Sequence, residues 1–204
     1  VGHAGFTDGA TITYRAVIWD KAGNRTLGSA YAGTQVIDTT VPTVAKVFAN
    51  TPANPLKIGD SHNITVRMSS NPTISGTPTL ALDTDNTPGT AIGSASYASV
   101  STTDMVFSYT VGAGEFALNP NYLNVNGANP VTLTSAYIRD AAGNNANLDF
   151  SALSTANKLS ASLVEVDGVA PTKLTIQSVK TVGDTVRVGY WNEDNTSVKV
   201  RVNL

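Results

Sequence analysis

The sequence predicts an all-β protein, and three observations lead to that prediction. Charged residues make up only 14% of the 204 residues, well below the roughly 25% of an average soluble domain. Thr, Ser, Val and Asn are abundant instead, and β-branched residues favour strands over helices. Short runs of alternating apolar and polar residues recur, separated by clusters of Gly, Pro, Asn and Asp. Many short strands with regularly spaced turns are typical of a β-sandwich.

Period-two alternation identifies the strands in chain order. The alternating runs are residues 11–20, 62–68, 104–111, 184–191 and 196–204. In the third run, Phe107 and Tyr109 belong to the set that we expect on the buried face. Residues 150–158 favour at most a short helical turn, and we expect Trp19 and Trp191 to be partly buried packing residues.

The chain contains an internal repeat, which predicts how it is organised. A turn of the form Asp-x-Ala-Gly-Asn occurs twice, and each copy is followed further along by an Asp four residues before a Pro. A Gly-Asp pair and an alternating strand come after each Pro. The repeated pieces are the turns 20–24 and 140–144, the segments 36–43 and 165–172, and the strand regions 56–68 and 180–190.

These repeats divide the chain into one complete module and two partial ones. We expect 1–40 to be the C-terminal part of one module, 41–170 a complete module, and 171–204 the N-terminal part of a following module. Two interpretations stay open. The chain is a piece of a longer array, as Val1 in place of a start methionine suggests, or the partial modules complete each other between neighbouring copies. The second arrangement builds a head-to-tail filament, because a head-to-tail contact that does not close into a ring adds one copy after another.

Composition argues against several classes of partner. The formal net charge is -2 and no cluster of Lys or Arg is present, which argues against nucleic-acid binding. No apolar run is as long as a membrane-spanning helix, so we expect no membrane insertion. The sequence has no cysteine, which excludes disulfides, thiolate metal sites and cysteine nucleophiles.

Familiar motifs for catalysis are missing from the sequence. His3 and His62 are the two histidines, and neither lies in a motif with an acid and a nucleophile. Residues 83–90 resemble the start of an EF-hand only superficially, because Pro88 and Ser94 occupy the positions of the required Gly and Glu. We interpret that segment as a hairpin turn and predict that the protein is not an enzyme.

Several stretches of the complete module resemble a known family. They include "GDSHNITVRMSS", "GTPTLALDT", "MVFSYTVGAGE", "AYIRDAAGNNANLDF" and "VDGVAPT". Together they are similar to the bacterial immunoglobulin-like repeats of large surface proteins, in particular the SwmB-type repeat. The segment 1–40 looks like a shorter, related repeat, and neither partial module matches the SwmB-type length.

This resemblance implies a fold and a role. The fold is an immunoglobulin-like β-sandwich, one complete module between two partial ones. The role is that of a structural spacer in an adhesin, an S-layer-like coat or another cell-surface filament, located outside the cell, with neighbouring repeats or copies as partners. Calcium at the module junctions is part of that expectation. The alternative is an adhesin module that binds a glycan or a protein ligand.

The repeated turn admits two interpretations. In the first, the Asp carboxylate caps the turn, Gly supplies a positive φ, and Asn tolerates the left-handed region, so the turn is only a hairpin loop. In the second, the Asp and Asn oxygens also contribute to a calcium site, since calcium prefers six to eight oxygen ligands. The turn between the last two strands of an immunoglobulin-like sandwich faces the segment by which the chain enters the domain, which carries Asp38. The predicted calcium ligands form two sets: Asp38 with Asp140 and Asn144, and Asp167 with Asp20 and Asn24.

Overall fold

The structure is a computed structural model of the chain, and its regular elements are nearly all strands. No α-helix occurs in the part of the chain that it describes, which confirms the all-β prediction. The described residues are 7–13, 15–30, 35–52, 55–85, 91–170, 175–182 and 185–191.

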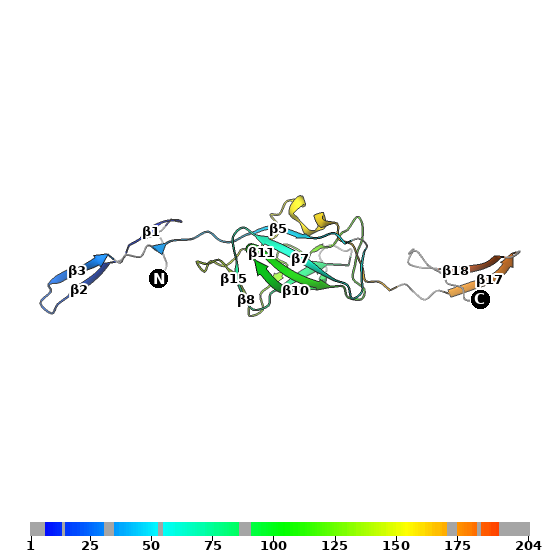
Figure 1. Cartoon of the computed structure of the whole chain (residues 1–204), viewed down its shortest axis with the longest axis horizontal. Coiled ribbons are helices and arrows are strands. Elements are labelled where there is room, and N and C mark those ends of the chain that lie inside the picture. Colours follow the sequence, from blue (N-terminus) through cyan, green and yellow to red (C-terminus); the bar gives the residue numbers. More distant parts are fainter. Residues whose placement is uncertain are drawn as a thin grey trace.

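Two small sheets precede the central part of the chain. One pairs β1 with β4 and the other pairs β2 with β3, both antiparallel. A further hairpin, β17 with β18, follows the central part. These strands are β1 (Thr11–Ile12), β2 (Arg15–Trp19), β3 (Arg25–Ala30), β4 (Gln35–Val36), β17 (Thr175–Val182) and β18 (Thr185–Trp191). Among the described residues, none of these strands pairs with the central sheet (Figure 1).

The strands β5 to β16 form one central body. Its largest sheet has the strand order β13-β9-β10-β11-β7-β5, with β14 also paired to β9. These strands are β5 (Val44–Ala49), β7 (Ser61–Met68), β9 (Thr79–Asp83), β10 (Ala91–Ser101), β11 (Asp104–Thr110), β13 (Asn124–Val125) and β14 (Val131–Thr132). Each neighbouring pair within this sheet is antiparallel.

Two smaller sheets and two short helices complete the central body. The smaller sheets have the orders β12-β16-β6 and β15-β8, and β16 runs parallel to β6. Their strands are β6 (Leu56–Lys57), β8 (Thr73–Ser75), β12 (Phe116–Ala117), β15 (Tyr137–Arg139) and β16 (Val166–Asp167). The 3-10 helix η1 (Thr155–Asn157) lies within residues 150–158, where the sequence favours a short helical turn, and η2 (Leu159–Ser162) follows that segment.

The core lies between the large sheet and the smaller elements. Phe107 and Tyr109 are fully buried, which confirms the face predicted from alternation in residues 104–111. The apolar residues of β7, Ile64 and Val66, are also fully buried. They pack in one cluster with buried side chains of the smaller sheets, such as Val166 of β16. One hydrophobic core therefore holds the central body together.

The β2–β3 hairpin does not bury its apolar residues in the same way. Trp19 is 61% exposed and Ile18 is 63% exposed, and Val17 and Leu27 are also largely exposed. The expectation that Trp19 is partly buried is therefore wrong. The physical reason is that this two-stranded sheet meets no second layer among the described residues, and a hairpin alone cannot bury a face. The side chain of Trp191 lies outside the described residues.

Candidate functional site: the junction before the central body

The two copies of the repeated turn have the same hydrogen bonds. In each copy, the backbone N–H of the Asn donates to Asp Oδ1, at 2.8 Å for Asn24 to Asp20 and 2.8 Å for Asn144 to Asp140. In each copy, the Asn side-chain Nδ2 also donates to Asp Oδ2, at 2.9 Å in both. These hydrogen bonds are sufficient to explain why Asp and Asn occupy the two ends of the turn, as in the interpretation of the turn as only a hairpin loop.

The glycine of the turn is explained by backbone conformation. Gly23 has a φ of 88° and Gly143 a φ of 97°, a region that side chains with a Cβ rarely adopt. Each glycine donates its N–H to the carbonyl of the turn's Asp, at 3.1 Å and 3.3 Å respectively. The turn therefore requires Gly at its fourth position, with Asp at its first position and Asn at its last.

One copy of the turn makes a further contact, which joins it to the preceding linker. The Nδ2 group of Asn144 donates to the backbone carbonyl of Asp38 at 3.1 Å. Asp38 thus lies beside the Asp140–Asn144 turn, as the first predicted set requires. The contact uses the backbone oxygen of Asp38, however, and not its carboxylate.

Three more hydrogen bonds hold the end of the linker against the central body. The N–H of Asn147 donates to the carbonyl of Pro42 at 2.8 Å, and Thr43 forms a parallel bridge with Asn147. On the other side of the linker, the N–H of Thr43 donates to Ser69 Oγ at 2.9 Å, and the N–H of Ser69 donates to the carbonyl of Thr43 at 2.8 Å. The linker is therefore fixed between the segments that follow β15 and β7.

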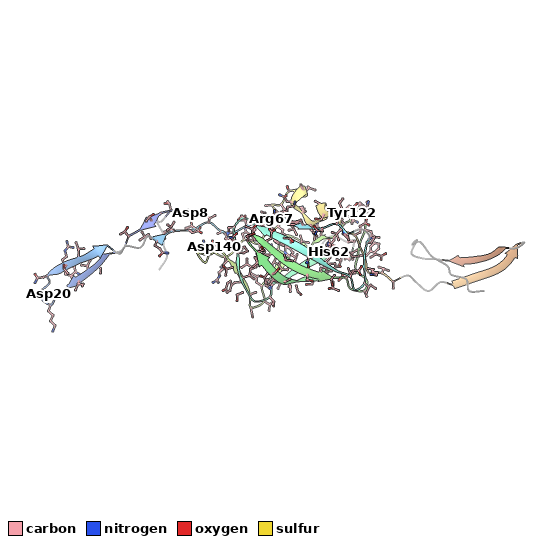
Figure 2. All side chains as sticks on the ribbon, in the orientation of Figure 1. Asp8, Asp20, His62, Arg67, Tyr122 and Asp140 are labelled. Atoms are coloured by element: carbon pink, nitrogen blue, oxygen red, sulfur yellow. The ribbon has the colours of Figure 1, made fainter. Side chains whose placement is uncertain are left out.

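Asp8 connects the same linker, residues 38–43, to the part of the chain that contains β1 to β4. Its Oδ1 accepts a hydrogen bond from the N–H of Thr39 at 2.7 Å, and its Oδ2 accepts one from the hydroxyl of Thr40 at 3.1 Å. The carboxylate of Asp38 accepts the N–H of Thr40 at 2.9 Å. Figure 2 shows Asp8 before the central body and Asp140 at the end of the body that the linker reaches, whereas Asp20 lies far from both. We call residues 38–43, with Asp8 and the 140–147 segment, the junction.

Asp8 is the residue of the junction that the sequence does not indicate. It lies one residue before Gly9, which has a φ of 76°, in a turn that leads into β1. An Asp-Gly pair indicates a turn, but nothing in the sequence indicates that its carboxylate contacts residues 31 positions later.

The groups that meet at the junction do not match the oxygen ligands that a calcium ion needs. Both carboxylate oxygens of Asp140 accept hydrogen bonds from Asn144, whose NH2 group faces Asp140 Oδ2 and the carbonyl of Asp38. That NH2 group is a donor placed among the oxygens that a cation needs as ligands. Among the described residues, no group of three or more His, Cys, Asp or Glu side chains could hold a metal ion. The hydrogen bonds alone account for the junction.

The second predicted set is not brought together within one chain. Asp20 and Asn24 close the turn between β2 and β3. Asp167 ends β16, where its carboxylate accepts the N–H of Val169 at 3.2 Å. This set is expected between adjoining modules or copies, so contacts within a single chain do not test it.

Acid is expected to weaken the junction before it unfolds the core. Hydrogen bonds lower the pKa of Asp8, mainly the one from the N–H of Thr39 and then that from the hydroxyl of Thr40. Burial raises the pKa of Asp140, but hydrogen bonds from Asn144 outweigh it, so that this pKa is also lowered. Each carboxylate therefore contributes stability above its unfolded pKa of about 3.9, and this contribution is lost as the pH falls through the lowered folded pKa.

Amide hydrogen exchange across an acid pH series would measure this loss. We expect the protection factors of the Thr39 and Asn144 amides to fall as the pH is lowered below the unfolded pKa of about 3.9. The Phe107 amide, in the centre of the large sheet, should keep its protection at the pH values where the junction first loosens. Equal loss at all three amides would show that the carboxylates do not control the junction separately.

The fold and the junction define an all-β protein with a hydrogen-bonded joint ahead of its central body. No family model, curated protein or solved structure matches the chain. In the described part of the chain, no helix has the length and apolar character required to cross a membrane.

Proposed function

We propose that this protein is a structural repeat module of an extracellular surface protein or filament. In this proposal the central body is an immunoglobulin-like sandwich that acts as a spacer, and the units before and after it belong to neighbouring repeats. The observation that carries the proposal is the junction. Its linker is bonded on one side to Asp8 and on the other to Asn144 and Asn147, and a spacer needs joints that restrict bending.

The internal repeat supports the same proposal. The turns at residues 20–24 and 140–144 have matching hydrogen bonds in two separate units. Repeat proteins are built from units that contact their sequence neighbours, so one local design is reused along the chain. A catalytic role requires no such repetition of a turn.

The Asn144→Ala variant tests the junction, and Asn24→Ala is its matched control. Both variants remove the same bond within the turn, but only Asn144→Ala also removes the bond to Asp38. One hydrogen bond contributes about 1 kcal/mol, so we expect the open state of the junction to become about fivefold more populated in Asn144→Ala. Limited proteolysis at residues 38–43 would measure this as a faster cleavage rate, with the rate in Asn24→Ala unchanged.

Calcium provides the second arm of this experiment. A junction held by hydrogen bonds should show the same cleavage rate with calcium chloride and with a chelator. Protection that depends on calcium would support the predicted ligands instead, and it would contradict the hydrogen-bonded junction. Equal cleavage of both variants and the unmodified protein would contradict the proposed stiff joint.

A further inference from the structure

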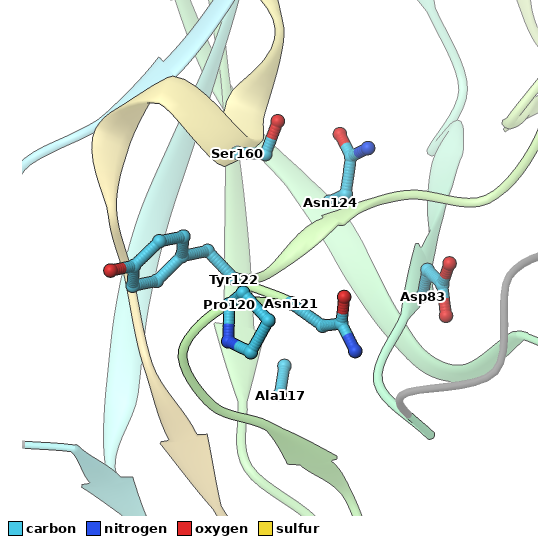
Figure 3. Close-up of a pocket in the computed structure, with 7 residues that line it drawn as sticks. All are labelled: Asp83, Ala117, Pro120, Asn121, Tyr122, Asn124 and Ser160. Atoms are coloured by element: carbon cyan, nitrogen blue, oxygen red, sulfur yellow. The ribbon is translucent and has the colours of Figure 1, made fainter.

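Two hollows lie side by side on the central body and share two polar residues. The smaller has a volume of about 230 Å³ and the larger about 410 Å³, and Asp83 and Asn124 line both. The smaller hollow occurs where the loop after β12 and η2 meet the end of β9, and the larger occurs where the loop after β13 and residues 150–158 meet it. Figure 3 shows the smaller hollow, with Asp83 and Asn121 on one side and Tyr122 on the other.

Strand pairing places the two shared residues together. Asp83 is the last residue of β9, and Asn124 is its direct antiparallel partner on β13. Directly opposite residues of antiparallel strands project from the same face of the sheet. The short strand β13 thereby sets an amide beside a carboxylate at the edge of the large sheet.

Asn124 has an unused acceptor at this place. Its Oδ1 is shielded from solvent and accepts no hydrogen bond. A buried acceptor that lacks a donor destabilises the fold, and such groups in folded proteins call for an explanation. A ligand that brings an O–H or N–H donor would satisfy this oxygen.

The other lining residues indicate the chemistry of that ligand. The smaller hollow is also lined by Asn121, Tyr122 and Ser160. The larger hollow is also lined by the basic residue Lys158 and the apolar residue Leu153. With one carboxylate and one ammonium group, the pair of hollows suits a neutral ligand. Many hydrogen-bonding groups beside an aromatic ring and apolar side chains suit a molecule with several hydroxyls and an apolar face.

We propose that these two hollows bind a neutral saccharide, with one sugar ring in the smaller hollow and the next ring in the larger. Asp83 and Asn124 accept hydrogen bonds from hydroxyls where the two rings join. Asn121 and Ser160 contact the first ring, and Lys158 donates to a hydroxyl of the second. This binding activity goes beyond the spacer role and does not depend on the junction.

Nuclear magnetic resonance of the full chain tests the proposal directly. The probes are maltose, cellobiose, lactose and chitobiose, each added to about 10 mM, tenfold above a Kd of about 1 mM. We expect at least one of them to shift the amide signals of residues 83, 121–124 and 158–160 with a saturable dependence. Calcium chloride is the comparison, because a cation site is the other use of these oxygens.

Two variants separate binding from folding. Asp83→Asn retains the shape of the side chain but removes its charge, and Asn121→Ala truncates an exposed residue outside the core. Asp83→Asn should weaken binding of the sugar by about tenfold or more, as expected when a hydrogen bond to a charged group is lost. Asn121→Ala should weaken it by about fivefold, as expected when a hydrogen bond to a neutral group is lost. Asn63→Ala, at an exposed site on β7 away from both hollows, should leave binding unchanged.

The outcomes are distinct from those of the junction experiment. No shift with any of the four sugars would overturn the saccharide proposal, as would shifts with calcium chloride alone. Binding that persists in both Asp83→Asn and Asn121→Ala would also overturn it. None of these results bears on the spacer proposal, which is tested at residues 38–43.

Discussion

The Phe107→Ala variant is expected to lose about 3–5 kcal/mol of the free energy of unfolding of the central body. Phe107 is fully buried in the middle of β11, and its ring packs edge-on against Tyr97 with the ring centres 6.0 Å apart. Truncation removes apolar contacts and leaves a cavity that strands on both sides, β10 and β7, prevent from closing. Urea denaturation followed by circular dichroism would measure the shift in midpoint.

Ser108→Ala is the control for that experiment. Ser108 is the next residue of β11 and is exposed on the opposite face. Its substitution should change the free energy of unfolding by no more than about 0.5 kcal/mol. A small loss in Phe107→Ala, comparable to that in Ser108→Ala, would contradict the position of the core.

The Gly168→Ala variant is expected to destabilise the end of the central body by about 3 kcal/mol. A Cβ at this position would lie 2.3 Å from the carbonyl oxygen of Gly112 and 2.7 Å from that of Glu115. Both atoms belong to backbone, and Gly168 is bonded to the same loop through its N–H to the Glu115 carbonyl at 2.7 Å. The loop cannot move aside without losing that bond.

The loop around Gly168 also carries a buried polar pair. The hydroxyl of Tyr109 donates to Glu115 Oε2, which also accepts the N–H of Gly112 at 3.0 Å. Displacement of the loop by a new Cβ would therefore disturb this pair as well. The expected readout is a lower denaturation midpoint together with a change in the near-ultraviolet circular dichroism of tyrosine.

Val169→Ala is the matched control for Gly168→Ala. Val169 is the next residue and is 45% exposed, so its truncation leaves the close backbone approach intact. We expect a loss within about 0.5 kcal/mol. If Gly168→Ala were as stable as Val169→Ala, the close packing of residue 168 against residues 112 and 115 would be wrong.

Alternation in the sequence predicts the buried faces only where another layer covers the strand. In residues 104–111 the prediction is correct, because Phe107 and Tyr109 face a core supplied by the smaller sheets. In residues 11–20 the same alternation occurs, yet Ile18 and Trp19 are exposed. Alternation indicates a strand and its two faces, but it contains no information on whether a second layer is present.

The candidate site could be predicted in position but not in chemistry. The repeated turn and the need for the chain to enter near it were enough to place Asp38 beside Asp140 and Asn144. Which atoms meet depends on backbone geometry, and there the Asp38 carbonyl takes the place that the prediction gives to its carboxylate. Asp8 could not be predicted, since a contact over 31 residues has no local sequence signal.

The parallel pairing of β16 with β6 has a mechanical consequence. Val166 lies opposite Leu56, and Asp167 lies opposite Lys57. When the chain is pulled at both ends, tension enters the central body through β5 on one side and β16 on the other. Once the tension passes beyond β5, it loads β6 and β16 in opposite directions along their parallel pair. Two parallel strands loaded in opposite directions slide along each other, so their hydrogen bonds and those of the adjoining β12 resist together and do not break one after another. If such units are joined in the filament proposed above, that filament would yield by sudden rupture of whole units rather than by gradual peeling.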